Sequence, residues 1–342
     1  MIMNRLFIKL CGIAAISMLL FSTDAAAKKK PLELKVGSYN LCTSDSRVKQ
    51  IKSGKFTSQQ KYWCNSAESV AAMIADLDCD IMGFQEVCDS IWGVKGELGI
   101  QKLVAEKRGA DDYEWVLFPN TGKKKISYDD AICYKKDVFT ELGSGIFWLG
   151  GNPEKPIRVE GAPKGTNRPA VWVWLKHKKS GKKFYFICTH LVLGTMHKDG
   201  GTEYNAEQFI QYADYDLVPS NTPSIVVGDF NSAPLTPKEI KKAEKEGKTP
   251  ENGFTIMTSS RWKDAFLALK EAGKLEENEL MAGTQPKKDE SGFGKWYPDH
   301  IMYSKEFEPK SFKIDRRMFP TKDGSMHFPS DHLPIVSILT LK

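Results

Sequence analysis

One apolar run near the middle of the chain ends abruptly on an acid and an amide. Residues 224–231 read Ser-Ile-Val-Val-Gly-Asp-Phe-Asn, and a short β-branched run of this kind is typical of a buried strand. Asp229 and Asn231 follow it two residues apart, so both side chains leave the strand end on the same side. Gly, Asp and Asn also form plain turns, but ligand and catalytic groups gather at strand ends. The run therefore predicts a buried strand with chemistry at its end.

Polar residues stand at the ends of other predicted strands as well. Taken singly, each has an ordinary explanation, such as a strand-ending amide, a surface charge or a satisfied structural histidine. Their recurrence at one strand end after another predicts a single polar pocket built from distant segments. These residues are Asn40, Gln85, Glu86, Thr189, His190, Asp299, His300, Ser330, Asp331 and His332.

Many short strands and only a few long helices are expected. This composition favours two packed sheets flanked by helices over a regular βαβ array. The lysine-rich segment 237–251 reads as a solvated helix and loop inserted between elements, and no linker or internal repeat divides the chain. Strands are expected near 32–41, 79–87, 114–118, 128–134, 170–176, 183–191, 224–229, 300–303, 310–314 and 333–341, and helices near 58–77, 98–107 and 203–218.

The first residues differ from the rest. A weakly cationic start precedes an apolar stretch, Leu10 to Phe21, that is short for a membrane span, and Ala25-Ala26-Ala27 offers a small-residue cleavage site. We therefore expect a signal peptide at residues 1–27, cut after Ala27, and a single domain at 28–342. The mature protein would be secreted or periplasmic, without stable membrane insertion. An uncleaved membrane anchor is the alternative.

Charge and cysteine usage constrain the chain less. The formal net charge is +6, which suits a polyanionic substrate but is shared by many unrelated proteins. No cysteine spacing suggests zinc, and Cys133 and Cys188 sit in apolar strand patterns as predicted buried thiols. An exported chain permits disulfides, although spacing does not decide their pairing. The candidate pairs are Cys42 with Cys64 and Cys79 with Cys88.

Seven short motifs occur in a fixed order from Leu34 to the C-terminus. They are Ser-Tyr-Asn40, Gln85-Glu86, Tyr128-Asp129-Asp130, Thr189-His190, Gly228-Asp-Phe-Asn231, Asp299-His-Ile301 and Ser330-Asp-His-x-Pro334. Together they resemble the endonuclease/exonuclease/phosphatase superfamily, which includes pancreatic-type deoxyribonucleases, abasic-site endonucleases, neutral sphingomyelinases and inositol-polyphosphate 5-phosphatases. The resemblance implies an α/β fold, a four-layer αββα sandwich of two mixed, mainly antiparallel sheets flanked by helices. It also implies phosphoester hydrolysis.

Hydrolysis of a phosphate ester needs a cation on the anionic oxygens, a base for the water and relief of the developing charge. Mg²⁺ prefers hard oxygen ligands, so Glu86 is the first candidate ligand, with Asn40 and Asp331 beside it. Mn²⁺ or Ca²⁺ are alternatives. Some relatives carry an acid two positions beyond the first Asn, where this chain has Cys42, which favours a single metal ion.

The resemblance also assigns catalytic roles. Asp229 would orient or deprotonate the attacking water, and Asn231 would hold the phosphate or the nucleophile. His190 and His332 would donate to phosphate oxygens, and a neighbouring carboxylate favours the charged form of a histidine. By motif position, the carboxylate partners are Asp130 for His190 and Asp299 for His332. Two further positions that contact the phosphate in the family are Tyr128 and Arg168, for which strand packing and a surface ion pair are the respective alternatives.

Substrate choice lies in the loops around such a core. An exported, basic enzyme is expected to cut DNA or RNA, and Trp296-Tyr297 is placed to stack on a base. A sphingomyelinase-type phosphodiesterase comes second. A phosphoinositide phosphatase comes third, because that subgroup's Cys-Asp-Arg is replaced by Pro298-Asp299-His300. A catalytically inactive binding module is the alternative from another class. A monomer is expected.

Overall fold

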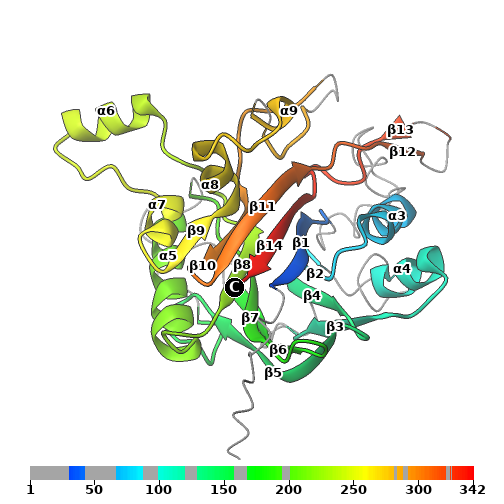
Figure 1. Cartoon of the computed structure of the whole chain (residues 1–342). Helices are drawn as coiled ribbons and strands as arrows, with labels where there is room; N and C mark the ends of the chain where they lie inside the picture. Colours follow the sequence, from blue (N-terminus) through cyan, green and yellow to red (C-terminus); the bar gives the residue numbers. More distant parts are fainter. Residues whose placement is uncertain are drawn as a thin grey trace, which may run out of the picture. The chain divides into compact units, whose positions relative to one another are not determined.

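The structure is a computed structural model that describes residues 31–42, 67–87, 99–119, 129–157, 168–194, 201–280, 283–287, 292–320, 324 and 326–342. Within them, two six-stranded sheets lie face to face with helices on their outer sides (Figure 1). The predicted four-layer sandwich is therefore confirmed. Pro31–Lys342 forms one compact unit. The predicted signal peptide lies outside the described residues.

The first sheet has the strand order β11-β14-β1-β2-β4-β3. Its only parallel neighbours are β1 and β2, and this pair lies at its centre. The carboxyl ends of these two strands therefore open on the same edge of the sheet. The strands are β1 (Leu32–Asn40), β2 (Ile81–Gln85), β3 (Tyr113–Leu117), β4 (Asp130–Lys135), β11 (Phe307–Ile314) and β14 (Ile335–Leu341).

The second sheet has the order β5-β6-β7-β8-β10-β9 and again one central parallel pair, β7 and β8. The two parallel pairs pack against each other across the interface between the sheets. The strands are β5 (Phe139–Trp148), β6 (Pro169–His177), β7 (Lys183–His190), β8 (Ser224–Asp229), β9 (Trp262–Asp264) and β10 (Asp299–Ser304). A separate short hairpin joins β12 (Phe319–Pro320) to β13 (Met326–His327).

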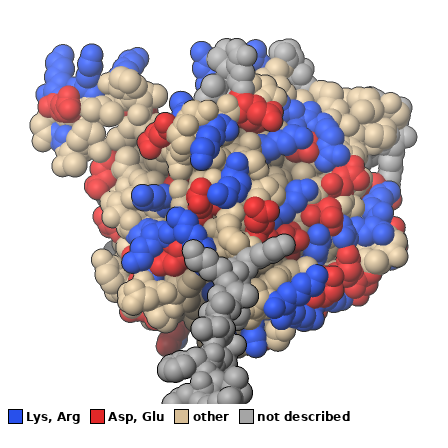
Figure 2. Space-filling model, viewed as in Figure 1, with Lys and Arg blue, Asp and Glu red and all other residues tan. Residues whose placement is uncertain are grey.

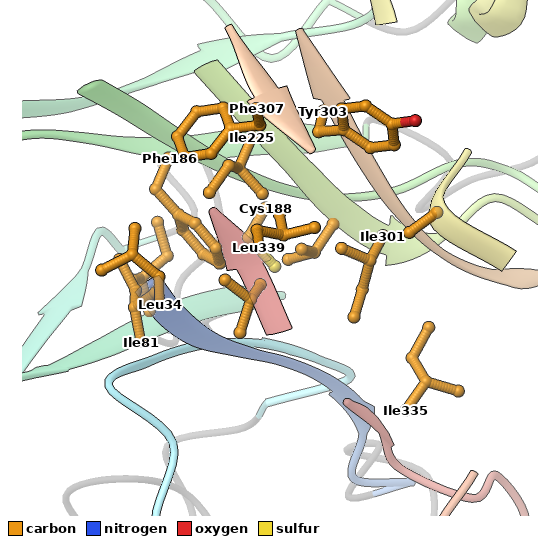
Figure 3. Close-up of a cluster of buried hydrophobic side chains, with 14 of the residues drawn as sticks. Leu34, Ile81, Phe186, Cys188, Ile225, Ile301, Tyr303, Phe307, Ile335 and Leu339 are labelled. Atoms are coloured by element: carbon orange, nitrogen blue, oxygen red, sulfur yellow. The ribbon is translucent and has the colours of Figure 1, made fainter. Parts of the chain in front are cut away.

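The core between the sheets is built from inward-facing aliphatic and aromatic side chains, among them Leu34, Ile81, Phe186 and Ile225 (Figure 3). Each strand contributes alternate residues to this layer, as a pleated strand with one buried face requires. At Gly83 the sheets approach so closely that a Cβ atom would lie 2.4 Å from Cγ2 of Val227. Only glycine fits there without a shift in its neighbours.

Helices cover the outer faces. The first sheet packs against α3 (Ala67–Leu77) and α4 (Ile100–Arg108). The second packs against α5 (Thr202–Ile210), the π-helical η2 (Gln211–Leu217) and α7 (Gly253–Thr258). The remaining helices are α6 (Pro237–Lys245), α8 (Ala265–Glu271) and α9 (Glu277–Leu280). None of the helices in the described ranges has the length and apolarity to cross a lipid bilayer.

Cysteines behave only partly as expected. Cys133 and Cys188 are buried thiols, as predicted from their strand patterns. Cys79 is also a buried free thiol, and burial raises its pKa to about 12. The suggested bridge between Cys79 and Cys88 is therefore wrong, because Cys79 is enclosed by the core under α3. Cys64 and Cys88 themselves lie outside the described residues.

Candidate active site

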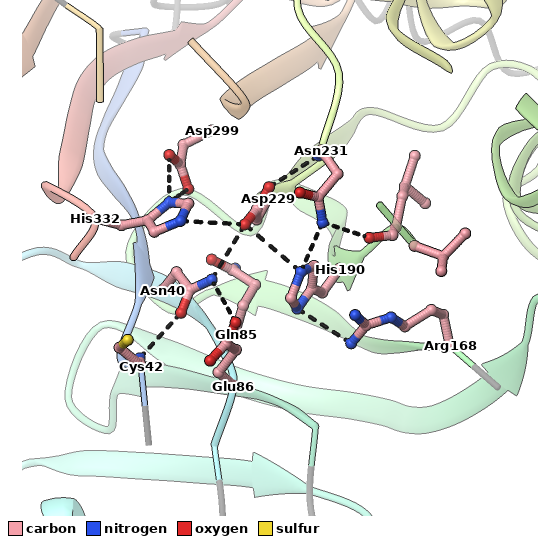
Figure 4. Close-up of polar contacts among 12 residues, drawn as sticks. Asn40, Cys42, Gln85, Glu86, Arg168, His190, Asp229, Asn231, Asp299 and His332 are labelled. Atoms are coloured by element: carbon pink, nitrogen blue, oxygen red, sulfur yellow. Dashed lines mark hydrogen bonds and ion pairs between the residues drawn. The ribbon is translucent and has the colours of Figure 1, made fainter. Parts of the chain in front are cut away.

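Strand register alone brings the polar strand ends together. In the first sheet, Asn40 stands beside Gln85, and Gln85 beside Asp130. In the second, Asp229 stands between His190 and Asp299. Because the central strand pairs of the two sheets pack together, the strand ends of both sheets converge with His332 and Arg168, as Figure 4 shows for Asn40, Gln85, His190, Asp229 and Asp299. These distant segments of the chain thus meet at one place, which we refer to as the pocket.

Asp229 lies at the centre of this pocket and is buried. Its Oδ2 accepts a hydrogen bond from Asn40 Nδ2 (3.1 Å) and lies 3.5 Å from His190 Nε2 and 3.6 Å from His332 Nε2. Its Oδ1 accepts from the backbone N–H of Asn231 (2.9 Å). Burial raises the pKa of Asp229 to about 7, and the positive charge of His332 limits the rise. A carboxyl group with such a pKa is suited to proton transfer at neutral pH.

His332 is held by a carboxylate, as its motif position predicts. Its Nδ1 lies 2.8 Å from Oδ2 and 3.1 Å from Oδ1 of Asp299, which also accepts a hydrogen bond from the Thr284 hydroxyl. Burial by itself would lower the pKa of His332, but the charges of Asp299 and Asp229 raise it well above the usual value. The imidazole is therefore cationic at neutral pH, and its Nε2–H points toward Asp229.

His190 differs from the prediction. Its Nδ1 faces Nη1 of Arg168 (3.3 Å), and its Nε2 lies 3.0 Å from the Asn231 amide. A guanidinium only donates, so Nδ1 is an acceptor and cannot carry the proton that Asp130 would need. Burial, then the charges of Arg168 and His332, lower the pKa of His190 well below its usual value. The expected pairing with Asp130, and the charged state that it implied, are wrong.

Asp130 instead remains a buried acid without a hydrogen bond. Within the described part of the chain, neither carboxylate oxygen has a hydrogen-bond partner, and the same is true of Oε1 of Gln85, its neighbour in register. Burial raises the pKa of Asp130 well above the usual value, and the charge of Asp129 adds to this, whereas Arg168 opposes it. Buried polar groups normally find a partner, so this carboxyl group is an exception inside the site.

Two of the three predicted metal ligands, Asn40 and Glu86, lie beside Asp229. Asn40 Nδ2 is 3.4 Å from Glu86 Oε1, and Ser330 joins the carbonyl oxygen of Asn40 (2.6 Å) to the loop that carries Asp331. Glu86 and Asp331 are half-buried carboxylates, whereas the amide oxygen of Asn40 accepts from the backbone N–H of Cys42 (3.0 Å) and would have to turn to reach a cation beside Glu86. These hard oxygen donors fit a divalent cation such as Mg²⁺.

A second geometric cluster joins Asp229, Asp299 and His332, whose ligand atoms all lie within 4.8 Å of one another. The hydrogen bonds between His332 Nδ1 and Asp299 already account for two of its members. The pKa of His332 is raised well above its usual value, and a histidine has to be neutral to bind a metal. The group around Glu86 is therefore the better metal candidate.

Unusual backbone geometry marks the same strand ends. Cys42, Glu86 and Asn231 have φ values of 55°, 55° and 46°, a region that residues other than glycine seldom adopt. Each follows the last residue of β1, β2 or β8 by one or two positions. Strained backbone of this kind is typical of functional sites. Among the described non-glycine residues, Asp78 is the one other with positive φ.

The remaining predicted residues are placed as follows. Arg168 reaches the pocket and contacts His190, which contradicts the surface ion pair as its sole role. Tyr128 lies outside the described residues. His300, which the sequence left without a role, is buried between the rings of Phe230 and Phe254 and bonds Asp264 and Ser232.

The sequence analysis missed Gln285. Its Nε2 lies 2.8 Å from Nε2 of His332, the nitrogen that faces the pocket. Both atoms carry hydrogen when His332 is cationic, so the Gln285 amide then has to turn its oxygen toward the ring. Gln285 is held there because the preceding Thr284 is fixed twice, through its hydroxyl on Asp299 and through its carbonyl, which accepts from the N–H of Leu333 (2.7 Å). The local sequence Gly-Thr-Gln-Pro carries no signal that would have identified it.

Comparisons with known proteins agree with this geometry. A family model described as "Endonuclease/Exonuclease/phosphatase family" matches residues 37–332. A search of curated proteins finds no match. Among solved structures, an endonuclease/exonuclease/phosphatase family protein from Bacteroides thetaiotaomicron is 22% identical with a TM-score of 0.66, covering 92% of this chain and 99% of that one.

Two further solved structures share the fold at lower similarity. A mannosyl-6-phosphatase from the same organism is 22% identical with a TM-score of 0.63, over 90% of this chain and 99% of that one. TDP2 from D. rerio, complexed with a single-strand DNA product, is 14% identical with a TM-score of 0.54, over 90% of this chain and 98% of that one. At these identities the likeness supports the architecture alone.

Proposed function

Because this chain belongs to the endonuclease/exonuclease/phosphatase family of phosphoester hydrolases, we propose that it is an exported, Mg²⁺-dependent phosphodiesterase that hydrolyses DNA or RNA. One observation carries the chemical part of the proposal. Asp229, with a pKa raised to about 7, lies between two histidines and accepts from the Asn40 amide, which also contacts the carboxylate of Glu86. This arrangement offers a base for water and donors for a phosphate in one pocket.

Each group of residues has its own role in this mechanism. Asp229 accepts a proton from the attacking water, and the Asn231 amide orients the phosphate or the water. His332, held cationic by Asp299, donates from Nε2 to a phosphate oxygen as negative charge develops there. Glu86, Asn40 and Asp331 would hold the divalent ion, which neutralises charge on the phosphate when bound.

Arg168 adds a positive charge to the same pocket. Its Nη1 contacts His190, and its Nε has no hydrogen-bond partner although it is buried. A guanidinium with donors to spare is suited to bidentate binding of a phosphate. Arg168 would therefore turn from His190 to the substrate, while His190 retains its contacts with Asn231 and Asp229.

The choice of nucleic acid as substrate rests on charge and compartment. The chain is basic, with a formal net charge of +6, and residues 1–27 have the pattern of a signal peptide. The DNA product in D. rerio TDP2 supports the same choice, whereas the mannosyl-6-phosphatase supports a phosphomonoester. A polyanionic substrate agrees best with the basic balance. A sphingomyelinase-type or phosphoinositide activity remains the alternative.

A panel of substrates tests the proposal. The purified protein is assayed with Mg²⁺ on bis-p-nitrophenyl phosphate, plasmid DNA, single-stranded DNA, RNA, sphingomyelin and inositol phosphates. We expect nucleic acid to be cut fastest, EDTA to abolish turnover and Asp229→Ala to be inactive while remaining folded. Faster turnover of a lipid or an inositol phosphate would overturn the nuclease assignment, and an inactive wild type with every metal would favour the binding module.

Export has a separate test. The protein is expressed with its first 27 residues in a bacterium, the cytoplasmic, periplasmic and culture fractions are separated, and the N-terminus of the purified protein is sequenced. Recovery outside the cytoplasm with an N-terminus at Lys28 supports export. Retention in the cytoplasm with an intact first segment contradicts it.

A further inference from the structure

The helix α6, Pro237–Lys245, has no buried residue. In Figure 1 it stands apart from the two sheets, and in Figure 2, drawn from the same side, its Lys side chains project from this protrusion. A nine-residue helix without tertiary packing is only marginally stable in water. Something other than burial must account for its presence.

Local sequence supplies the stabilisation. Thr236 caps the helix and Glu239 completes a capping box, with 2.7 Å from the Thr236 backbone N–H to a Glu239 carboxylate oxygen. Pro237 occupies the first turn, where its fixed φ favours the helix. The segment is thus built to be helical by itself, outside the core.

The lysines of α6 share one face. They follow the spacing i, i+3, i+4, i+7, which at 100° per residue places them within a sector of about 100°. All four are exposed, and Glu239, Glu244, Ile240 and Ala243 occupy the rest of the helix surface. We refer to Lys238, Lys241, Lys242 and Lys245 as the lysine face.

Opposing effects act on this arrangement. Lys242 lies 4.0 Å from Glu246, and basic side chains suit the last turn of a helix. Lys238 with Lys242, and Lys241 with Lys245, are like charges four residues apart, and such pairs are destabilising on a helix surface. A helix that serves only solubility carries both signs interspersed on its exposed face. On a face of one sign, the repulsion between neighbouring lysines would be relieved by a bound polyanion.

The base of α6 is fixed to the active site. The segment 234–251 leaves and re-enters the domain at one point, where Asn252 Nδ2 donates to the Ala233 carbonyl (2.9 Å) and the Phe254 N–H donates to Ser232 Oγ (2.9 Å). The ring of His300 bonds the carbonyl of Ser232, which directly follows Asn231. The lysine face is therefore carried by an arm rooted one residue from the pocket.

We propose that the lysine face binds the phosphate backbone of a nucleic-acid strand that is being cut at the active site. This inference rests on the proposed nuclease function and adds a second binding surface to it. The lysine face extends over about 10 Å, from a rise of about 1.5 Å per residue, and one strand carries a phosphate every 3.4 Å of duplex axis, so it covers about three phosphates. The helix has only Ile240 and Ala243 as apolar residues, which is too little for burial in a membrane surface.

The test separates binding from cleavage. A K238Q/K241Q/K242Q/K245Q variant and the wild type are titrated with fluorescent oligonucleotides in EDTA. The salt concentration is varied between about 50 and 200 mM, because counterion release makes nucleic-acid affinity fall steeply over this range. We expect at least tenfold weaker binding of the variant at about 50 mM salt and a salt slope smaller by about three. Turnover of bis-p-nitrophenyl phosphate with Mg²⁺ should match the wild type, which also shows that the variant is folded.

A matched control removes the same number of charges elsewhere. Exposed lysines at the end of β6 and in the turns that follow β6 and β10 lie at the opposite ends of these strands from Arg168 and Asp299. Their replacement should leave oligonucleotide affinity and salt slope unchanged. The control variant is K176Q/K178Q/K179Q/K305Q.

The other possible outcomes each count against the proposal or against the function on which it rests. Equal oligonucleotide binding by the α6 variant and the wild type overturns the proposal. So does an equal loss in both lysine variants, because the effect would then be one of net charge. Loss of binding to phosphatidylserine vesicles with unchanged oligonucleotide binding assigns the lysine face to a membrane instead. A wild type that turns over the small ester but cuts no nucleic acid refutes the proposed function, and the binding titration in EDTA still judges the lysine face on its own.

Discussion

Replacement of Asp130 by Asn should make the protein more stable at neutral pH. The carboxyl group is buried, neither oxygen has a hydrogen bond, and the neighbouring Oε1 of Gln85 lacks a donor. The amide of Asp130→Asn is nearly the same shape, carries no charge and brings an N–H to a place where Gln85 offers an acceptor. The substitution therefore replaces a carboxyl group that burial keeps from ionising by a neutral amide with an N–H donor.

The expected gain follows from the cost of leaving polar groups unpaired. A buried polar group without a partner costs about 1–3 kcal/mol in mutational data, so we expect a gain of about 2 kcal/mol at neutral pH. The pKa of Asp130 is raised in the folded state, so the wild type is penalised only once the group would ionise. As pH rises above the usual carboxyl range, wild-type stability falls relative to Asp130→Asn, so the gap should be smaller at pH 4, where mainly the added amide N–H contributes.

Urea denaturation at pH 4 and pH 7.5 measures both free energies of unfolding. A variant that is no more stable at pH 7.5, or a gap that is equal at the two pH values, would refute the reasoning. Turnover of bis-p-nitrophenyl phosphate gives the second measurement. The charge of Arg168 opposes the rise in the pKa of Asp130, so the stabilised variant should lose about tenfold in kcat/KM if this acid helps to position Arg168 for the phosphate.

Three further outcomes are expected. Gln285→Leu should lower kcat/KM about tenfold, because the amide oxygen of Gln285 can turn to accept from the charged His332 Nε2–H and leucine cannot. Gln285→Glu should raise KM for anionic esters, and unchanged values in both variants would exclude a role. Gly83→Ala should lower the free energy of unfolding, measured by urea denaturation, by about 1–3 kcal/mol, and adding Val227→Ala should restore part of it. If the two substitutions lowered this free energy additively, the close approach of the sheets at Gly83 would be contradicted. Saturating Mg²⁺ should raise the Tm of the wild type by an amount equivalent to about 2–4 kcal/mol. The Tm of Glu86→Gln should rise little, and an equal rise in both proteins would place the ion away from Glu86.

Much of the fold could be predicted because its strands carry strong local patterns. The strand that ends at Asp229 and the one that ends at His190 are continuous apolar runs, as fully buried central strands must be. The edge strand β5 was missed, since most of its residues are exposed or half-buried and show no apolar alternation. A sequence pattern that reflects burial is weakest in an edge strand, which pairs with another strand on one side only.

The site could be predicted as a set of residues but not as a set of contacts. Asp299 pairs with His332 as expected, because register places Asp299 next to Asp229 and the loop before β14 returns to the same edge. His190 does not pair with Asp130, since the longer side chain of Arg168 reaches its Nδ1 first. Which of two charged groups reaches a ring nitrogen depends on side-chain geometry, and the order of motifs along a chain does not contain it.

Backbone strain is the part of the site that the sequence conceals most completely. Asn adopts positive φ with some frequency, so Asn231 gives a weak hint, but Glu86 and Cys42 give none. Such a conformation costs on the order of 1–3 kcal/mol and persists only where the surrounding structure enforces it. Here the enforcement comes from the central strands β1, β2 and β8, which are paired on both sides and buried.

The central strands β1, β2 and β8 thus stabilise the domain and also enforce the unfavourable backbone conformations at the sheet edge where they end. Strained residues after three strand ends and one unpaired acid, Asp130, gather where Asp229 and His332 face the pocket. Departures from local rules are expected at functional sites, where stability is given up for chemistry. If Asp130→Asn gained stability and kept full activity, this acid would be an unpaired group without a function, and the link between strain and catalysis would have to rest on Glu86 and Asn231 alone.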